Sequence, residues 1–421
     1  MHIATSLDLD VVALEGDDEI SLLVELTAPI AMADRPHPPR TLVVVLDRSG
    51  SMQGERLSGA QRALTDLLDR LDPDDRFGLI TFDNTVRVDI PVAPLVDKTR
   101  ARQCIAEVRP GGATDLSAGY LRGLQEARRS VVGAGCRLLL ISDGHANAGV
   151  VDPEQLGAVA AKAAADGITT TTTLGFGLGY DERLLKAIAA GGNGSELFAE
   201  HADQAVAAIS AELDGLLAQT AQAASVLVRM SPCCRGMKLI NELTSVPNSD
   251  GVQIELGAFY SGEARRLVIT FDVPGIAALG LAQVADLDFT WVELPALIQH
   301  SVTVPVHVNV VPGDQAAGRI PDPTVRTELA FLRTQQAKRA AADRMSSGDA
   351  SGGIAAMRAA GSMLRAAMAA APAAMRADLS EDLNAIDRLT AEARAGDLSR
   401  AAKALSADTS RKSRRRGSAT L

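Results

Sequence analysis

The chain of 421 residues is poor in the residues that mark several large classes of protein. Aromatic residues make up only 3%, with one Trp and three Tyr, so stacking platforms for single-stranded nucleic acid are not expected. Four cysteines are too few for a disulfide framework, and no C-x-x-C spacing indicates a zinc site. Apolar runs fall far short of the roughly 20 residues that a membrane-spanning helix needs. We therefore expect an aliphatic core and no membrane span.

The two ends of the chain differ in charge from its body. The first residues, MHIATSLDLDVV, lack the basic start and long apolar stretch of a secretory signal, so we expect a cytoplasmic protein. The formal net charge is -10, and five basic residues lie within the last eleven positions. An acidic body opposes binding to nucleic acid by phosphate neutralisation. Residues 409–421 are predicted to be a basic, disordered tail, with contact to an anionic partner as the functional alternative.

Two regions show the period-two alternation that is typical of antiparallel strands. Residues 1–36 contain the runs HIATSLDLDVVAL and EISLLVELTA, separated by a turn, and predict a β-hairpin. Residues 224–312 contain six such runs punctuated by Gly and Pro, and predict a β-sandwich. Because an isolated hairpin is marginal in water, we expect the first region to join the second. The segment between them would then be an inserted domain.

That segment, residues 40–218, alternates short buried strands with stretches of helical period. Three of its strands, TLVVVLD, RLLLISD and ITTTTTLGFG, are nearly all apolar or β-branched, as a sheet covered on both faces requires. The pattern predicts an α/β domain with a doubly wound, mostly parallel sheet. Residues 323–408 are rich in Ala, and helices at about 325–346, 352–371 and 375–406 predict a helical bundle.

Five polar residues of the α/β segment are expected at one edge of its sheet. Asp47 closes a buried strand, and Ser49 and Ser51 follow it in DRSGSM. Thr114 follows a Gly-Gly loop, and Asp143 ends another buried strand. In open α/β sheets, ligands bind beyond the carboxyl ends of the strands. Two carboxylates and three hydroxyls are hard ligands that suit Mg²⁺ or Mn²⁺ and leave a coordination position for an acidic group of a partner.

These motifs strongly resemble the von Willebrand factor type A (VWA) domain with its metal-ion-dependent adhesion site. The resemblance rests on DRSGSM, GGATDL and SDGHAN, continues through DDRFGLITFDN and LGFGLGYDERLLKAIAAGGNGSELF, and covers about residues 40–215. It implies a doubly wound domain that binds Mg²⁺ or Mn²⁺ and, through the metal, an acidic residue of a partner protein, without enzymatic activity. The flanking regions look like those of bacterial multidomain proteins, and intracellular members commonly act in the assembly of complexes.

Two other functions stay open at this point. The Ala-rich C-terminal region and basic end also fit a helical scaffold whose metal site is vestigial. A Mg²⁺-dependent phosphatase is the enzymatic alternative, because Mg²⁺ held by aspartates beyond sheet strands can orient a phosphate. The segment LGFGLG lacks the third glycine of a dinucleotide loop, so no nucleotide site is expected. His145 is expected in an exposed loop and Asp115 at a helix N-terminus. Partner identity and oligomeric state do not follow from the sequence.

Overall fold

The computed structural model describes residues 1–30, 39–130, 136–144, 146–167, 169–217, 219–294 and 296–414. The central segment folds around a six-stranded sheet in the order β6-β5-β4-β7-β8-β9. All neighbouring strands in it are parallel except β5 and β6. The strands are β4 (Thr41–Asp47), β5 (Arg76–Phe82), β6 (Val86–Pro94), β7 (Cys136–Ser142), β8 (Thr169–Phe176) and β9 (Asn193–Ala199).

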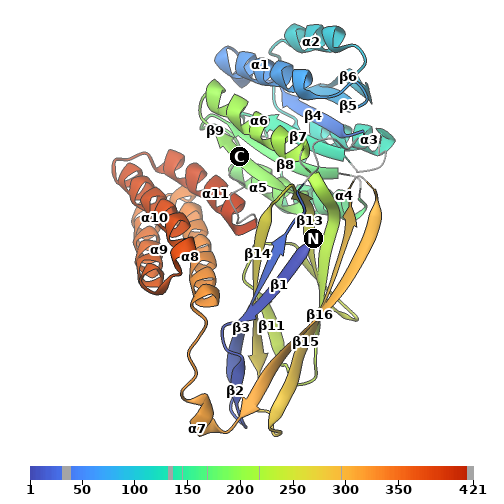
Figure 1. Ribbon diagram of the computed structural model, residues 1–421. Coiled ribbons are helices and arrows are strands. Elements are labelled where there is room, and N and C mark those ends of the chain that lie inside the picture. Colours follow the sequence, from blue (N-terminus) through green and yellow to red (C-terminus); the bar gives the residue numbers. More distant parts are fainter. Residues whose placement is uncertain are drawn as a thin grey trace.

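Helices cover both faces of this sheet (Figure 1). One apolar cluster joins it to α1 (Glu55–Arg70), α2 (Lys98–Glu107) and α6 (Ala202–Leu217). A second cluster on the other face joins it to α3 (Leu116–Ser130), α4 (Pro153–Ala165) and α5 (Glu182–Gly191). Strands β4 and β7 are buried along their whole length, as their apolar sequences predict. The expected α/β class, with a doubly wound and mostly parallel sheet, is confirmed.

Two further sheets pack face to face below the α/β domain (Figure 1). Their inner faces share one core, to which Ile20 and Phe271 contribute from one sheet and Val226 and Phe289 from the other. The first sheet has the order β1 (His2–Leu7), β3 (Asp18–Thr27), β14 (Ala264–Val273), β11 (Gly236–Leu239). The second has the order β12 (Ser245–Asn248), β13 (Gly251–Tyr260), β10 (Gln219–Met230), β15 (Gly280–Glu293), β16 (Ile298–Val311), β2 (Val11–Ala13).

The N-terminal strands complete these later sheets. Strand β3 pairs with β14 in antiparallel register from Asp18 opposite Val273 to Thr27 opposite Ala264. The α/β domain is thus inserted in the chain between β3 and β10, and the antiparallel pairing of β10 with β13 and β15 continues the sandwich after it.

The single first strand predicted from HIATSLDLDVVAL is wrong, because the structure divides it into β1 and β2 in different sheets. The division falls at Asp8, whose buried carboxylate accepts the backbone amide of Ser21 at 2.6 Å and pairs with Arg326 at 3.1 Å. Strand β2 then pairs in parallel with β16. A buried charge with a distant partner therefore ends one strand and turns the chain toward the other sheet.

The C-terminal region is helical and follows a short helix, α7 (Gly313–Ala316). Its helices are α8 (Pro323–Ser346), α9 (Ala350–Ala370), α10 (Ala373–Arg394) and α11 (Leu398–Arg414). Leu23 of β3 and Val268 of β14 share the apolar cluster of the bundle and so attach it to the sandwich. The single predicted helix at 375–406 is wrong, because Gly396, with φ at +103°, separates α10 from α11. That left-handed conformation favours glycine and ends a helix.

The prediction of a disordered tail from residue 409 is also wrong for its first part. Helix α11 continues to Arg414, and Thr409 is buried. Lys412 lies 3.0 Å from the Asp382 carboxylate and 3.1 Å from that of Asp408, so it belongs to the interior of the bundle. The rest of the predicted tail, residues 415–421, lies outside the described residues. Within the described residues, no helix is both long and apolar enough to cross a membrane.

A buried ionic cluster connects three helices of the bundle. The ammonium group of Lys338 on α8 lies 2.8 Å from Asp382 on α10 and 2.6 Å from Asp408 on α11, and Gln335 donates to Asp382 at 2.9 Å. Lys338 and Asp382 are fully buried. Burial alone would raise the pKa of Asp382, but the charges of Lys338 and Lys412 outweigh it and lower that pKa. The charges of the two lysines and two aspartates compensate one another. Removing any one of them would therefore leave an uncompensated buried charge.

We therefore predict that Lys338→Met destabilises the bundle by about 3 to 5 kcal/mol, because it leaves two buried carboxylates with one cation. Urea unfolding of the full chain, followed by far-UV circular dichroism, measures the change. The matched control is Arg365→Ala, which breaks an exposed ion pair with Asp387 and is expected to cost at most about 1 kcal/mol. Equal unfolding midpoints for the two variants would contradict the role of the cluster.

Candidate metal site at the sheet edge

Asp47 stands at the carboxyl end of β4 with its side chain buried. One carboxylate oxygen accepts the backbone amide of Ser49 at 2.8 Å, and the other accepts the hydroxyl of Ser142 at 2.6 Å. Burial raises the pKa of Asp47, and the nearby charge of Asp143 adds to the increase, although the two serines oppose it. A carboxylate in such a place favours a cation beside it, because a cation offsets the loss of solvation.

Ser49, Ser51 and Asp143 form a continuous chain of oxygens beside Asp47. The hydroxyl oxygens of Ser49 and Ser51 are 3.0 Å apart, and Ser51 donates to the Asp143 carboxylate at 2.7 Å. Asp143 follows β7, which pairs in parallel with β4, so the two carboxylates reach the same edge of the sheet. The sequence prediction that these residues lie together therefore corresponds to their positions in the structure.

Thr114 reaches the same place from the loop before α3. Its hydroxyl oxygen and that of Ser51 each lie 3.4 Å from the point where a Cβ on Gly144 would stand. Its backbone amide donates to the side chain of Asn147 at 3.0 Å, which fixes the loop from the other side. All five residues predicted from the sequence are thus gathered at one sheet edge, from three separate loops.

The donor set fits a hard divalent cation. It combines two carboxylates with three hydroxyls, and these oxygen ligands suit Mg²⁺ or Mn²⁺. In the part of the chain that the structure describes, no three or more His, Cys, Asp or Glu side chains form a group that could hold a metal. A cation at this edge would therefore depend on serine and threonine hydroxyls as much as on the aspartates, and the set does not fit a zinc site built from Cys and His.

The sequence analysis missed the residues that hold these candidate ligands in place. The guanidinium of Arg56, at the start of α1, lies 2.5 Å from the second oxygen of Asp143 and 3.2 Å from the carbonyl of Ser51. Ser142 and Asn147 are the other two such residues. Ser142 immediately precedes Asp143, so its place at a strand end was a usable signal. Nothing in the sequence indicates that Arg56 turns back toward Asp143.

A second charged pair anchors the glycine loop that carries Thr114. Arg48 lies 2.9 Å from the Asp83 carboxylate, which also accepts the backbone amide of Gly112 at 3.2 Å. A Cβ on Gly111 would stand 1.8 Å from a carboxylate oxygen of Asp83, so position 111 has no room for a side chain. The backbone of the two loops is joined as well, because Gly50 donates to the carbonyl of Gly112 at 3.0 Å. The glycine pair thus allows the close approach that places Thr114.

A groove of about 580 Å³ opens beside Ser51 at this edge. Three segments form it: the start of α1, the loop after β8 and the loop after β9. Its lining residues are Ser51, Gln53, Glu55, Arg56, Phe176, Gly177, Leu178, Glu200, His201 and Ala202. The groove presents a mixed polar and apolar surface next to the candidate metal site.

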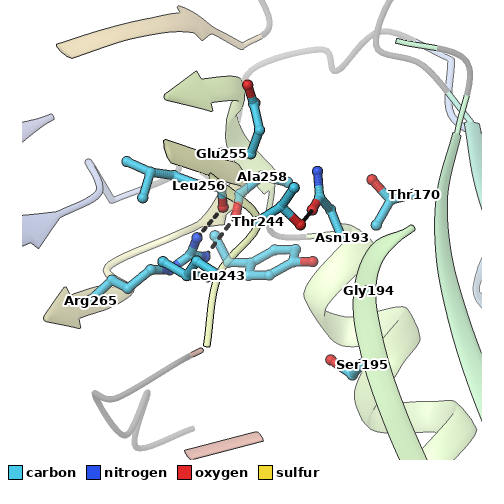
Figure 2. Close-up of a pocket in the computed structure, with 11 residues that line it drawn as sticks. Thr170, Asn193, Gly194, Ser195, Leu243, Thr244, Glu255, Leu256, Ala258 and Arg265 are labelled. Carbon is cyan, nitrogen blue, oxygen red and sulfur yellow. Dashed lines mark hydrogen bonds between the residues drawn. The ribbon is translucent and has the colours of Figure 1, made fainter. Parts of the chain in front are cut away.

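A much smaller cavity lies between the opposite end of the α/β sheet and the sandwich. Figure 2 shows Thr244 directed toward Asn193, with their side-chain oxygens 3.5 Å apart, and Arg265 directed toward the carbonyls of Leu256 and Ala258. Its volume of about 20 Å³ is enough for a single water molecule. This cavity is a feature of the joint between the two domains and does not accommodate a substrate.

Two residues near the candidate site, Asp115 and His145, were not predicted to be ligands. Asp115 accepts the hydroxyl of Ser117 at 2.8 Å and the amide of Ala118 at 2.9 Å, which places it at the start of α3 as expected. His145 lies outside the described residues.

We predict that Gly111→Ala destabilises the loop before α3 by about 1 to 3 kcal/mol, because the new methyl group must displace the Asp83 carboxylate. Amide hydrogen exchange across residues 109–116 is expected to become faster. The control is Gly236→Ala on β11, where a Cβ would meet open space. Equal exchange across residues 109–116 in both variants would show that the glycine is not needed for close approach.

Comparison with known sequences identifies the central domain. The family model for the von Willebrand factor type A domain matches residues 41–212. An uncharacterized protein of Synechocystis sp. is 33% identical over 169 residues, which are 40% of this chain and 39% of that protein. The uncharacterized protein YfbK of Escherichia coli is 28% identical over 200 residues, 46% of this chain and 34% of YfbK. Human inter-alpha-trypsin inhibitor heavy chain H4 is 28% identical over 160 residues, which are 36% of this chain and 17% of that protein. The chain thus spans less than two fifths of the length of these relatives.

Solved structures resemble the chain over nearly its whole length. The von Willebrand factor type A protein from Catenulispora acidiphila has a TM-score of 0.73 at 15% identity and covers 92% of this chain and 89% of its own. The ArnB paralog VWA2 from Sulfolobus acidocaldarius has a TM-score of 0.66 at 14% identity, with coverage of 96% and 98%. At these identities the likeness concerns the fold. Together with the family match, it shows that residues 41–212 are a von Willebrand factor type A domain, inserted in a β-sandwich and followed by a helical bundle.

Proposed function

We propose that the VWA domain binds a protein partner through a divalent cation, Mg²⁺ or Mn²⁺, at the edge of its sheet. The residues that would hold the cation are Asp47, Ser49, Ser51, Thr114 and Asp143. The observation that carries the proposal is a connected set of contacts. The Ser49 backbone amide donates to Asp47, the Ser49 and Ser51 hydroxyls are within hydrogen-bonding distance of each other, and the Ser51 hydroxyl donates to Asp143. Domains of this family commonly take part in protein–protein interaction, which supports a binding role.

The charge of the donor set favours an acidic partner. Two carboxylates offset the charge of one divalent cation, while the three hydroxyls add none, so the site as a whole is close to neutral. When bound, the cation supplies a point of positive charge that can accept a carboxylate oxygen from outside the domain. Ser142 and the amide of Ser49 hold Asp47, and Arg56 holds Asp143, so the ligands are oriented before a partner arrives.

The proposed role is binding and not catalysis. The hydroxyls of Ser51 and Ser142 donate to Asp143 and Asp47, the two carboxylates that the cation would neutralise. With those carboxylates bound to the cation, neither would be free to take the serine proton as a general base, which a nucleophilic mechanism requires. We propose that the protein acts in the assembly of a complex.

Replacing Asp47 tests the metal site directly. Asp47→Ala is expected to abolish saturable Mn²⁺ binding and to leave the fold intact, because it removes a poorly solvated carboxylate at the sheet edge and little core volume. Calorimetric titration after treatment with chelator measures the binding. The control is Asp69→Ala on the exposed face of α1, which is expected to bind as the wild type does.

Equal Mn²⁺ affinity in Asp47→Ala and the wild type would reject the proposed site. Turnover of p-nitrophenyl phosphate that requires Mg²⁺ and disappears in Asp47→Ala would instead support the phosphatase alternative.

A further inference from the structure

Helix α11 of the bundle lies against the edge strand β9 of the VWA domain (Figure 1). The buried ammonium group of Lys403 donates to the carbonyl of Tyr180 at 3.0 Å and lies 3.8 Å from the centre of the Tyr180 ring. Ser406, one turn further along the helix, donates to the buried carboxylate of Glu196 on β9 at 3.2 Å. Arg400, one turn before, pairs with Glu200. Three residues on one face of α11, each one turn from the next, therefore contact the VWA domain.

Two loops of the VWA domain lie between α11 and the candidate metal site, and we call them the rim loops: residues 177–181 after β8 and residues 200–201 after β9. In the first loop, a Cβ on Gly177 would stand 3.1 Å from the guanidinium of Arg56, and a Cβ on Gly179 would stand 3.3 Å from the carbonyl of Asp143. The same loop carries Tyr180, which Lys403 holds. One loop thus touches the candidate metal site and α11 at positions only one residue apart.

The second rim loop makes the same connection through charge. Glu200 lines the groove of about 580 Å³ together with Ser51 and Arg56. Its carboxylate is paired with Arg400 of α11, so the negative charge in the wall of the groove is neutralised from the bundle. Without Arg400, an acidic ligand in the groove would meet an uncompensated carboxylate, which disfavours its binding.

We propose that α11 is a latch that couples the helical bundle to ligand binding at the metal-site edge. In the docked state, α11 holds both rim loops and neutralises the groove, and this state favours an acidic ligand. When the bundle, with α11, separates from the VWA domain, the rim loops loosen and the charge of Glu200 is exposed to the ligand. The inference rests on the proposed metal-dependent function and adds its regulation: a change in the bundle alters affinity at the cation, and ligand binding in turn stabilises bundle docking.

Glu196 makes docking sensitive to pH. Burial raises its pKa to about 7, the charge of Glu182 adds to the increase, and Lys186, Ser406 and Lys403 oppose it. The groups that face it are Glu182 and Lys186 from α5, Tyr180 from the first rim loop, and Lys403 and Ser406 from α11. When the bundle, with α11, separates from the VWA domain, Glu196 meets water and its pKa falls toward the ordinary value of 4.5. The docked state therefore holds the proton more tightly, and docking weakens as the pH rises from 4.5 through about 7.

The latch can be tested in the full chain with Arg400→Gln, which removes the charge of a half-exposed side chain without touching the core of the bundle. Amide exchange across residues 176–199 reports the rim loop and β9, including the amide of Gly177, which donates to the carbonyl of Ala199 at 2.7 Å. We expect exchange about two- to fivefold faster and Mn²⁺-dependent binding of hexaglutamate weaker by a similar factor. The control is Arg365→Gln, whose ion pair with Asp387 lies within the bundle, and no change is expected there.

Outcomes for the latch and for the metal site can be separated. If the wild type binds no Mn²⁺, the proposed function fails, and the coupling fails with it. If the wild type binds Mn²⁺ but Arg400→Gln matches the control in both exchange and hexaglutamate affinity, the latch alone is overturned. If Arg400→Gln shows faster amide exchange but unchanged affinity for hexaglutamate, the coupling between α11 and ligand binding is overturned as well.

A pH series gives an independent test. Between about pH 6 and pH 8, exchange corrected for its intrinsic rate should increase more in the wild type than in Glu196→Gln, because the glutamine cannot lose a proton. Equal pH dependence in the two proteins would remove Glu196 from the mechanism.

Discussion

The parallel pairing of β4 with β7 is the constraint on which the candidate site depends. It sets Leu46 opposite Ile141, so Asp47 falls beside Ser142, and Asp143 follows at the same edge of the sheet. The strands are buried on both faces, and the chain can present polar groups only where they end. Two carboxylates then meet at this edge. Burial raises the pKa of Asp47, and its hydrogen bonds from Ser142 and Ser49 only partly offset this increase. The proposed divalent cation would complete this balance of charge.

Buried charge also organises the rest of the molecule. Asp8 ends β1 and sends the chain into the second sheet, where β2 pairs with β16. Lys338, between Asp382 and Asp408, fixes α11 to α8 and α10, and Lys403 and Ser406 then fix α11 to the VWA domain. Because α11 takes part in both sets of contacts, the inserted domain is attached to the helical bundle as well as to the sandwich that carries it. The position of the bundle is in this way linked to the loops around the candidate metal site.

Much of the fold follows from local sequence patterns, and the parts that do not are set by distant partners. The apolar run TLVVVLD and the alternating runs after residue 224 indicate their strands because burial alone decides them. The break after Leu7 depends on Ser21 and Arg326, and the continuation of α11 past residue 409 depends on Asp382, which no local pattern contains. For the site, motif spacing names Asp47, Ser49, Ser51, Thr114 and Asp143, while the contact of Arg56 with Asp143 spans 87 residues and becomes visible only in three dimensions. The break between α10 and α11 needs no distant partner, because Gly396 is itself a local signal for the end of a helix. The helical pattern on both sides of Gly396 obscured that signal.

The most direct test of the central claim is a crystal structure of the full chain grown with Mn²⁺, with anomalous scattering used to locate the ion. The account predicts one anomalous peak within bonding distance of the Ser49 and Ser51 hydroxyls, next to Asp47 and Asp143. Well-ordered side chains at this edge without such a peak at saturating Mn²⁺, or a peak elsewhere alone, would contradict it.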